Sequence, residues 1–347
     1  MLLIVSCQNF ELHKKSEVIS GPEFVAIAEG FDAQTKTALD GNSVIWSLSD
    51  QLAIFQGSSA ADTYQVKEDC VGKSAGTFEI IAKGESADAT ELEANVAFYP
   101  YKTGLTCTPA MSEDGNIASY QITGVTIPST KTYTSASFAD ESFLMAAITS
   151  GILDRDLNFK NVCGALRLQL KGTAKVKTIE LRGNDNEHLS GNASVSVYPD
   201  GTMPAIIMAS DASTTVTLDC GDGVQLNEDT ATPFLITIPP TDFEKGFSVK
   251  ITSVDGGIDV CSTSKSNPVK CSYIHIMPDV GIELEYGIKV LAIGNSFSVD
   301  ALQYLYNILA EVGYDSVTIG HLTIGGSSLQ EAGQPLFRNG KYFRSIS

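Results

Sequence analysis

The chain has 347 residues, 43% of them hydrophobic and 18% charged, which is typical of folded proteins and excludes a disordered chain. The formal net charge is −18, with 41 Asp and Glu against 23 Lys and Arg. Binding to nucleic acid is not expected, because the phosphate backbone requires clustered Lys and Arg and the longest basic run is Lys14-Lys15. The length predicts two or three domains.

The N-terminus, MLLIVSC, is a short apolar run that ends at Cys7. It resembles a bacterial lipobox, in which a cysteine is lipidated and becomes the new N-terminus. The run is shorter than the roughly 20 apolar residues that span a bilayer. We expect residues 1–19 to be the remnant of a lipoprotein signal and a polar tether, with Cys7 anchoring the chain to a membrane. The alternative is a buried N-terminal strand with an ordinary thiol.

Residues 20–286 contain many short apolar segments separated by turn formers, without long helical periodicity. The segment GALRLQLKG alternates Leu166, Leu168 and Leu170 with polar residues, which predicts a strand with one buried face. Such a series is typical of antiparallel β-sandwiches, and this one is too long for a single small sandwich. We therefore predict two tandem sandwiches, at 20–153 and 154–286, with a boundary near Asp154.

The other cysteines form no CxxC pair and no zinc spacing, so neither a metal nor another cofactor is expected. They are Cys70, Cys107, Cys163, Cys220, Cys261 and Cys271. A disulfide between Cys261 and Cys271 across a hairpin is one hypothesis. Small buried side chains with free thiols are the other.

Several segments of this region, in this order, resemble the fimbrillin-like surface lipoproteins of anaerobic gut and oral bacteria. They are TKTALDGNSVIWSLSDQLAIF, AFYPY, FKNVCGALRLQLKG, IELRGN and LSGNASV. The resemblance implies two transthyretin-like, Greek-key sandwich domains and an outer-membrane, cell-surface location. It also implies a role in adhesion or pilus assembly, with protein or glycan ligands. From the residues alone, Trp46, Phe55, Phe98 and Tyr101 are expected to be core aromatics.

Pilins of this kind complete a neighbour's sheet with a free terminal strand, a form of strand addition. Here the second predicted sandwich continues directly into another unit through PDVGIELEYGIKVLAIGNSFS. A free C-terminal donor strand is therefore not expected, and we interpret the chain as a tethered spacer or scaffold.

After residue 287 the pattern changes to that of a parallel βαβ unit. A continuous apolar run at 288–293 predicts a strand buried on both faces. Leu302, Leu305, Leu309 and Val312 then form a helical stripe, and DSVTIGHLTI predicts a second strand. A serine that follows such a strand lies at the mouth of the sheet, near the N-terminus of the helix.

IGNSFS followed by IGGSSL resembles the SGNH (GDSL-like) hydrolases, which are metal-free esterases, deacetylases and lipases. Ser296 matches the nucleophile of that family, Asn295 its neighbour in the first block, and Gly326 the oxyanion glycine of the second. The sequence has Asn295 where the commonest form has Asp.

The family's third block, and its Asp and His close to the C-terminus, have no counterpart in the tail SSLQEAGQPLFRNGKYFRSIS. His13, His188, His275 and His321 all lie where a structural or solvated role is expected. A serine without a base is a poor nucleophile at neutral pH. We interpret 287–347 as a truncated, inactive hydrolase segment carried by a surface protein. The alternatives are a surface esterase whose Asp and His lie beyond this chain, and an adhesin in which this segment has no role.

Overall fold

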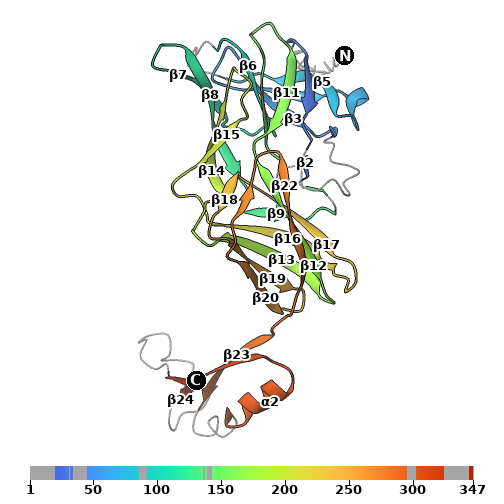
Figure 1. The fold of residues 1–347 in the computed structure, drawn as a ribbon, viewed down its shortest axis with the longest axis vertical. Helices are drawn as coiled ribbons and strands as arrows, with labels where there is room; N and C mark the ends of the chain where they lie inside the picture. The colour runs from blue at the N-terminus through green and yellow to red at the C-terminus, as the bar shows by residue number, and fades with distance from the viewer. Residues whose placement is uncertain are drawn as a thin grey trace, which may run out of the picture.

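The computed structural model describes residues 20–30, 32–33, 45–85, 92–135, 137–138, 143–294, 302–323 and 344–346. These residues form a column of β-sheets with a small strand–helix–strand unit at one end (Figure 1). The mainly β prediction is confirmed. The described residues contain one α-helix, α2 (Leu305–Glu311), and one 3₁₀ turn, η1 (Glu68–Cys70).

The first layer of the column is a sheet that closes on itself, in the strand order β1-β11-β10-β6-β3-β4-β5. Its strands are β1 (Phe24–Ala28), β3 (Gln51–Gln56), β4 (Asp62–Val66), β5 (Ala75–Ala82), β6 (Asn95–Tyr99), β10 (Met145–Ile148) and β11 (Asp156–Asn161). Closure depends on β1, which pairs antiparallel with β5 and parallel with β11. The sequence predicted a sandwich of two sheets from residues 20–153. The structure also has two layers here, but one of them is a closed barrel. Short strands with period-two patterning are compatible with both, since the pattern does not say which edge strands meet.

Trp46 fills the interior of this barrel. Its ring lies edge-on to three other rings, at centroid distances of 5.0 Å to Phe78, 5.7 Å to Tyr99 and 6.1 Å to Phe159. Its indole Nε1–H donates to the carbonyl of Ala26 at 3.3 Å, so the buried polar atom is satisfied. The prediction that Trp46 is a core residue is confirmed, since it is 1% exposed.

A second layer covers one outer face of the barrel. It is the sheet β15-β14-β8-β7, formed by β7 (Thr106–Met111), β8 (Ile117–Ile127), β14 (Gly191–Val197) and β15 (Ala205–Met208). Phe55 and Phe98 point outward from the barrel into the cluster that joins the layers, which confirms them as core aromatics. Tyr101 packs against the same cluster but is only partly buried.

The second half of the column is a two-sheet sandwich, as predicted. One sheet has the order β17-β12-β22-β2, with β2 (Asp32–Ala33), β12 (Gly164–Lys171), β17 (Thr232–Ile238) and β22 (Tyr273–Gly281). The other has the order β20-β19-β13-β16-β9, with β9 (Thr130–Thr132), β13 (Lys175–Gly183), β16 (Thr215–Gln225), β19 (Phe247–Ser253) and β20 (Ile258–Thr263). Strands β18 (Thr241–Phe243) and β21 (Asn267–Val269) form a short separate pair. The predicted inward row of Leu166, Leu168 and Leu170 is confirmed, because all three are buried in the core between the sheets.

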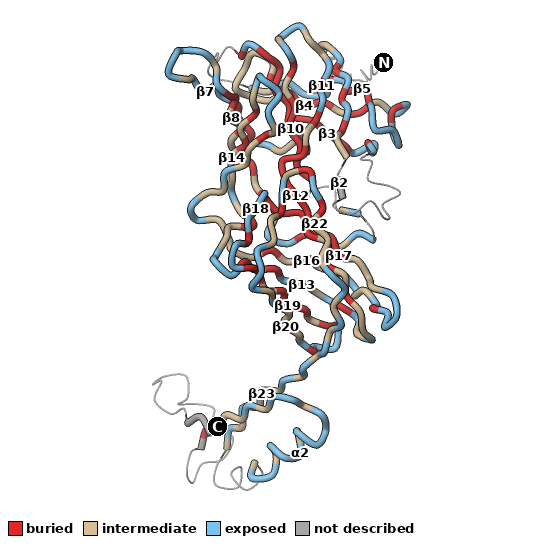
Figure 2. Tube along the Cα trace, viewed as in Figure 1, coloured by how far each residue is buried: buried red, intermediate tan, exposed pale blue. Residues whose placement is uncertain are grey.

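Strands pair across the boundary predicted near Asp154. Strand β9, before that residue, extends the sandwich by pairing with β16. Strand β11, after it, completes the barrel, and β14 pairs with β8 in the outer layer. The division into domains at this position stays a prediction, but the hydrogen-bonded sheets do not follow it. Figure 2 shows buried residues running through both halves of the column.

A polar cluster connects the two halves. The Glu29 carboxylate accepts the backbone N–H of Asn161 at 3.1 Å and the hydroxyl of Ser272 at 2.7 Å. The Cys271 thiol donates to the Asn161 carbonyl at 2.7 Å. Three segments far apart in the sequence therefore meet at one carboxylate.

The six cysteines that the structure describes are all free thiols, so the hypothesised Cys261–Cys271 disulfide is not formed. Cys107, Cys163 and Cys220 are buried, and desolvation raises the pKa of each thiol to about 12. This agrees with the alternative of small buried side chains. Cys7 lies outside the described residues.

Candidate functional site

The segment with the hydrolase-like motifs forms the strand–helix–strand unit at the end of the column (Figure 1). Strands β23 (Gly287–Gly294) and β24 (Ser316–Thr323) pair in parallel, with α2 between them in the chain, and β25 (Arg344–Ile346) pairs antiparallel with β24. The order strand, helix, strand and the parallel pairing agree with the sequence pattern, while an α/β domain stays a prediction. The residues that the structure describes contain no evidence for a hydrolase domain.

The two motifs follow strand ends that lie side by side. Gly294, the last residue of β23, is paired with Thr323, the last residue of β24. Asn295 and Ser296 follow the first end in the sequence, and Gly326 follows the second. All three residues lie outside the described part of the chain, so their roles as nucleophile, neighbour and oxyanion donor stay predictions.

Of the histidines expected to be structural, two lie in the column and one lies in the strand–helix–strand unit. His188 lies between β13 and β14, and His275 lies on β22, where desolvation lowers the pKa of the imidazole. His321 lies within β24, opposite Ala292. His13 is not among the described residues. In that described part, no three His, Cys, Asp or Glu residues are grouped as a metal site would require.

The carboxylate of Asp315 lies at the opposite end of the parallel pair from Gly294 and Thr323, because Asp315 precedes the first residue of β24. It accepts the backbone N–H of Tyr286 at 2.8 Å. Asp315 therefore fixes the start of the unit and is not placed to orient a base near the serine motif.

A contact that the sequence analysis missed joins this unit to the sandwich. The Tyr286 hydroxyl donates to Asp255 Oδ2 at 2.9 Å, and Asp255 also accepts the hydroxyl of Ser253. Gly257 leaves room for the tyrosine ring, since a Cβ built there would lie 2.8 Å from Tyr286 Cζ. The sequence signal for this contact was the turn Asp255-Gly256-Gly257. Its second glycine is explained by the close approach of the Tyr286 ring.

Apolar side chains of the unit remain in contact with solvent. Leu291 and Ile293 on β23 are 57% and 41% exposed, and Val312 after α2 is 71% exposed. No described residue of α2 is buried, as Figure 2 shows. Parallel sheets normally have both faces covered, and this one has a face that the described residues leave open.

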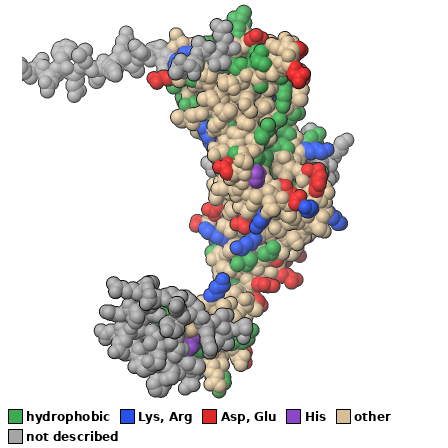
Figure 3. All heavy atoms as spheres, turned by 90° about the vertical axis from the view of Figure 1, so that its left-hand side faces the viewer, with side chains coloured by type: hydrophobic (Ala, Val, Ile, Leu, Met, Phe, Trp, Pro, Cys, Tyr) green, Lys and Arg blue, Asp and Glu red, His purple; other side chains and the backbone are tan. Residues whose placement is uncertain are grey.

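No described helix is long and apolar enough to be a membrane span. On the face shown in Figure 3, Lys and Arg side chains are interspersed with Asp and Glu over the column.

No protein-family model and no curated protein matches the sequence. Among solved structures, the chain is similar to a candidate cell adhesion protein from Bacteroides ovatus, with 10% identity, a TM-score of 0.40, and 69% of this chain and 86% of that chain covered. A candidate cell adhesion protein from Bacteroides uniformis has 12% identity and a TM-score of 0.38, with 76% and 96% covered. A third, from Bacteroides fragilis, has 12% identity and a TM-score of 0.34, with 76% and 93% covered. These scores are too low to carry an argument, so the fold rests on the sheets described above.

Proposed function

We propose that the chain is a lipid-anchored, fimbrillin-like protein of the outer membrane surface, in which the β-column is a spacer or adhesion scaffold that does not polymerise. Protein or glycan ligands at the cell surface are its proposed partners. The sequence motifs between residues 35 and 195 and the lipobox-like segment ending at Cys7 support the surface location. The adhesion-related names of the similar structures agree with the proposal without carrying it.

One observation favours a scaffold over a polymerising subunit. Strand β22, the last of the sandwich, is paired with β12 along most of its length, and β2 pairs with its start. The chain then passes through residues 282–286 into β23, and Tyr286 is held to Asp255 by a hydrogen bond. Strand addition requires a free extended segment, and β22 is committed to its own sheet.

The test has two parts. Cells of a bacterium with a lipoprotein pathway should carry the wild-type chain in the outer-membrane fraction, and Cys7→Ser should release it. The purified chain should migrate as a single species on unheated gels. Heat-stable ladders would contradict the scaffold proposal, and an unchanged membrane fraction for Cys7→Ser would contradict the anchor.

An SGNH-type surface esterase, with Ser296 as the nucleophile, is the second candidate. The parallel pairing of Gly294 with Thr323 favours it, because both motifs then begin at one edge of the sheet. We expect this chain alone to hydrolyse p-nitrophenyl acetate no faster than its Ser296→Ala variant. Activity that disappears in Ser296→Ala would establish the esterase and replace the non-catalytic interpretation.

A further inference from the structure

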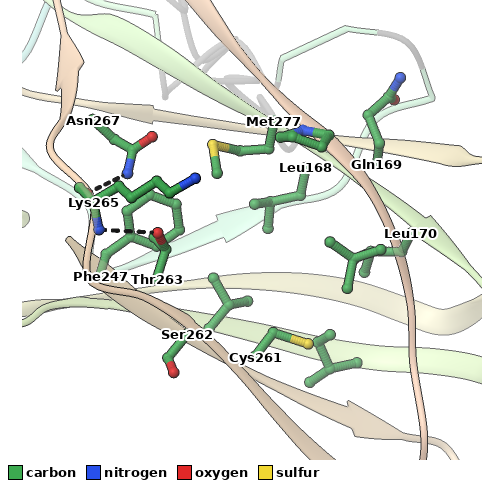
Figure 4. A pocket seen from close by; sticks show the side chains of 14 residues that line it. Leu168, Gln169, Leu170, Phe247, Cys261, Ser262, Thr263, Lys265, Asn267 and Met277 are labelled. Carbon is green, nitrogen blue, oxygen red and sulfur yellow. Dashed lines mark hydrogen bonds between the residues drawn. The ribbon is translucent and has the colours of Figure 1, made fainter.

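A pocket opens between the two sheets of the sandwich, at the edge formed by β20 and β22. Its volume is about 310 Å³. Figure 4 shows side chains that line it. Small-molecule pockets range from roughly 300 to 1,000 Å³, so this pocket suits a small ligand. It lies away from the strand–helix–strand unit and has no part in the proposed function.

The pocket exists because β20 presents its small side chains inward. In the antiparallel pairing with β19, Cys261 lies opposite Val249 and Thr263 opposite Phe247. Paired residues point to the same face of a sheet, so Cys261 and Thr263 face the core. The larger Val260 of this strand is 60% exposed on the outer face. The edge of the core therefore receives too little side-chain volume to be filled.

The walls of the pocket are apolar. Leu168 and Leu170 of β12 form one side, together with Met277 and Val280 of β22. Phe247 and Val249 of β19 form the other. An alkyl chain in this space would leave water and contact aliphatic and aromatic side chains on both sides. The transfer of apolar surface from water to such surroundings is favourable.

Lys265 is the only charged residue of the pocket lining. Its backbone is fixed at both ends, because its N–H donates to Thr263 Oγ1 at 3.2 Å and its carbonyl accepts from Asn267 Nδ2 at 2.6 Å (Figure 4). None of the ion pairs among the described residues involves its ammonium group. An exposed cation is thus available at the mouth of an apolar pocket, in a chain whose net charge is −18.

We propose that this pocket binds a medium-chain carboxylic acid. The alkyl chain lies between the sheets, against Leu170 and Phe247, and the carboxylate accepts a hydrogen bond from the Lys265 ammonium group. A carboxylate at this position would form a charge-assisted hydrogen bond, which is stronger than one between neutral groups.

The test is calorimetric titration of the full-length protein with decanoate. Decanol, which lacks the negative charge, and acetate, which lacks the long alkyl chain, are the comparison ligands. Decanoate should bind saturably, and the other two should bind more weakly. Lys265→Gln should weaken decanoate binding about tenfold, the effect of losing one charge-assisted bond. Lys250→Gln is the matched control, because Lys250 points outward from β19 opposite Val260 and should leave the affinity unchanged.

A second variant tests whether the alkyl chain of decanoate lies inside the pocket. Cys261→Leu adds volume inside the pocket and should abolish decanoate binding, while Cys261→Ser keeps the size and should retain it. Thermal unfolding checks that each variant is folded. If Cys261→Leu is not folded, the comparison of Lys265→Gln with Lys250→Gln alone tests the proposal. No saturable decanoate binding, equal affinity for decanol, or equal losses in both lysine variants would overturn the proposal. Occupation of the pocket by an extended peptide in place of decanoate would also overturn it.

Discussion

The hydroxyl of Tyr286 and the carboxylate of Asp255, 2.9 Å apart, hold the strand–helix–strand unit against the end of the sandwich. Asp255 lies in the turn after β19, and Tyr286 is the residue before β23. Hydrogen bonds from Ser253 and Tyr286 lower the pKa of the Asp255 carboxyl, and the bond to Asp255 raises the pKa of the Tyr286 hydroxyl. The contact is therefore strongest when Asp255 is ionised and Tyr286 is protonated.

This pair predicts a pH-dependent linkage. A depressed carboxyl pKa contributes stability that is present above the unfolded pKa and is lost as pH falls through the folded value. The contact should accordingly persist at neutral pH and weaken below about pH 4, the ordinary range of an aspartate. Limited proteolysis with an acid-active protease should show faster cleavage between Ile282 and Tyr286 as the pH falls.

Tyr286→Phe should cause the same loss at pH 7, because it removes the donor and keeps the ring, and a protease that is active at neutral pH should then cleave this segment faster than in the wild type. Tyr273→Phe is a matched control, since Tyr273 is a partly exposed residue of β22 with no side-chain bond to Asp255. Equal cleavage rates for the wild type and Tyr286→Phe at every pH would show that this hydrogen bond does not hold the unit.

Trp46→Ala should destabilise the barrel by about 3–5 kcal/mol, the usual cost of removing a large aromatic side chain from a core. Trp46 is the only tryptophan, so its fluorescence reports on the barrel interior of the wild type. The free energy of unfolding of the variant is measured by urea denaturation monitored by circular dichroism, because the variant has no tryptophan fluorescence.

Ile45→Ala is the control for Trp46→Ala. Ile45 precedes the tryptophan and is 59% exposed, so its truncation should change the free energy of unfolding by less than about 0.5 kcal/mol. Similar effects of the two substitutions would contradict the assignment of Trp46 as the centre of the barrel core.

Glu29→Gln should destabilise the column by about 1–3 kcal/mol, because an uncharged amide is a weaker acceptor for the Asn161 N–H and the Ser272 hydroxyl. Glu23→Gln is the comparison, because Glu23 forms a surface ion pair with Lys67 that should contribute about 0–1 kcal/mol. Chemical denaturation of both variants measures the difference. A larger loss in Glu23→Gln than in Glu29→Gln would contradict the role of Glu29 in joining the halves.

Fragments cut at the predicted boundary should not fold alone. Residues 20–153 lack β11, which closes the barrel, and residues 154–286 lack β9, which extends the sandwich. Each fragment should therefore be unfolded or aggregated by circular dichroism and size-exclusion chromatography, and 20–286 should unfold as one unit. Two soluble fragments, each with native-like β content, would show that the boundary near Asp154 divides independent domains.

The apolar exposure of the C-terminal unit was foreseeable in part. The run at 288–293 predicted a parallel strand and is found as β23, paired with β24. A strand of this composition is suited to burial on both faces, yet Leu291 is 57% exposed. Composition identifies the strand, but only the neighbours present in space determine which of its faces is covered.

The sequence by itself determined the local structure, because local structure depends on side-chain periodicity and turn residues. The alternation around Leu168 specified β12 and its buried face, and the turn formers separated the strands of the column. Only the tertiary structure decided the long-range pairing, such as the parallel pairing of β1 with β11. It also decided that β9 joins the sandwich by pairing with β16, and that β14 joins the outer layer of the barrel by pairing with β8. The faces of β20, where Cys261 points inward and Val260 outward, were decided in the same way. Backbone hydrogen bonds are nearly the same for every pair of strands, so the choice of partner and face is made by side-chain packing between segments far apart in the chain.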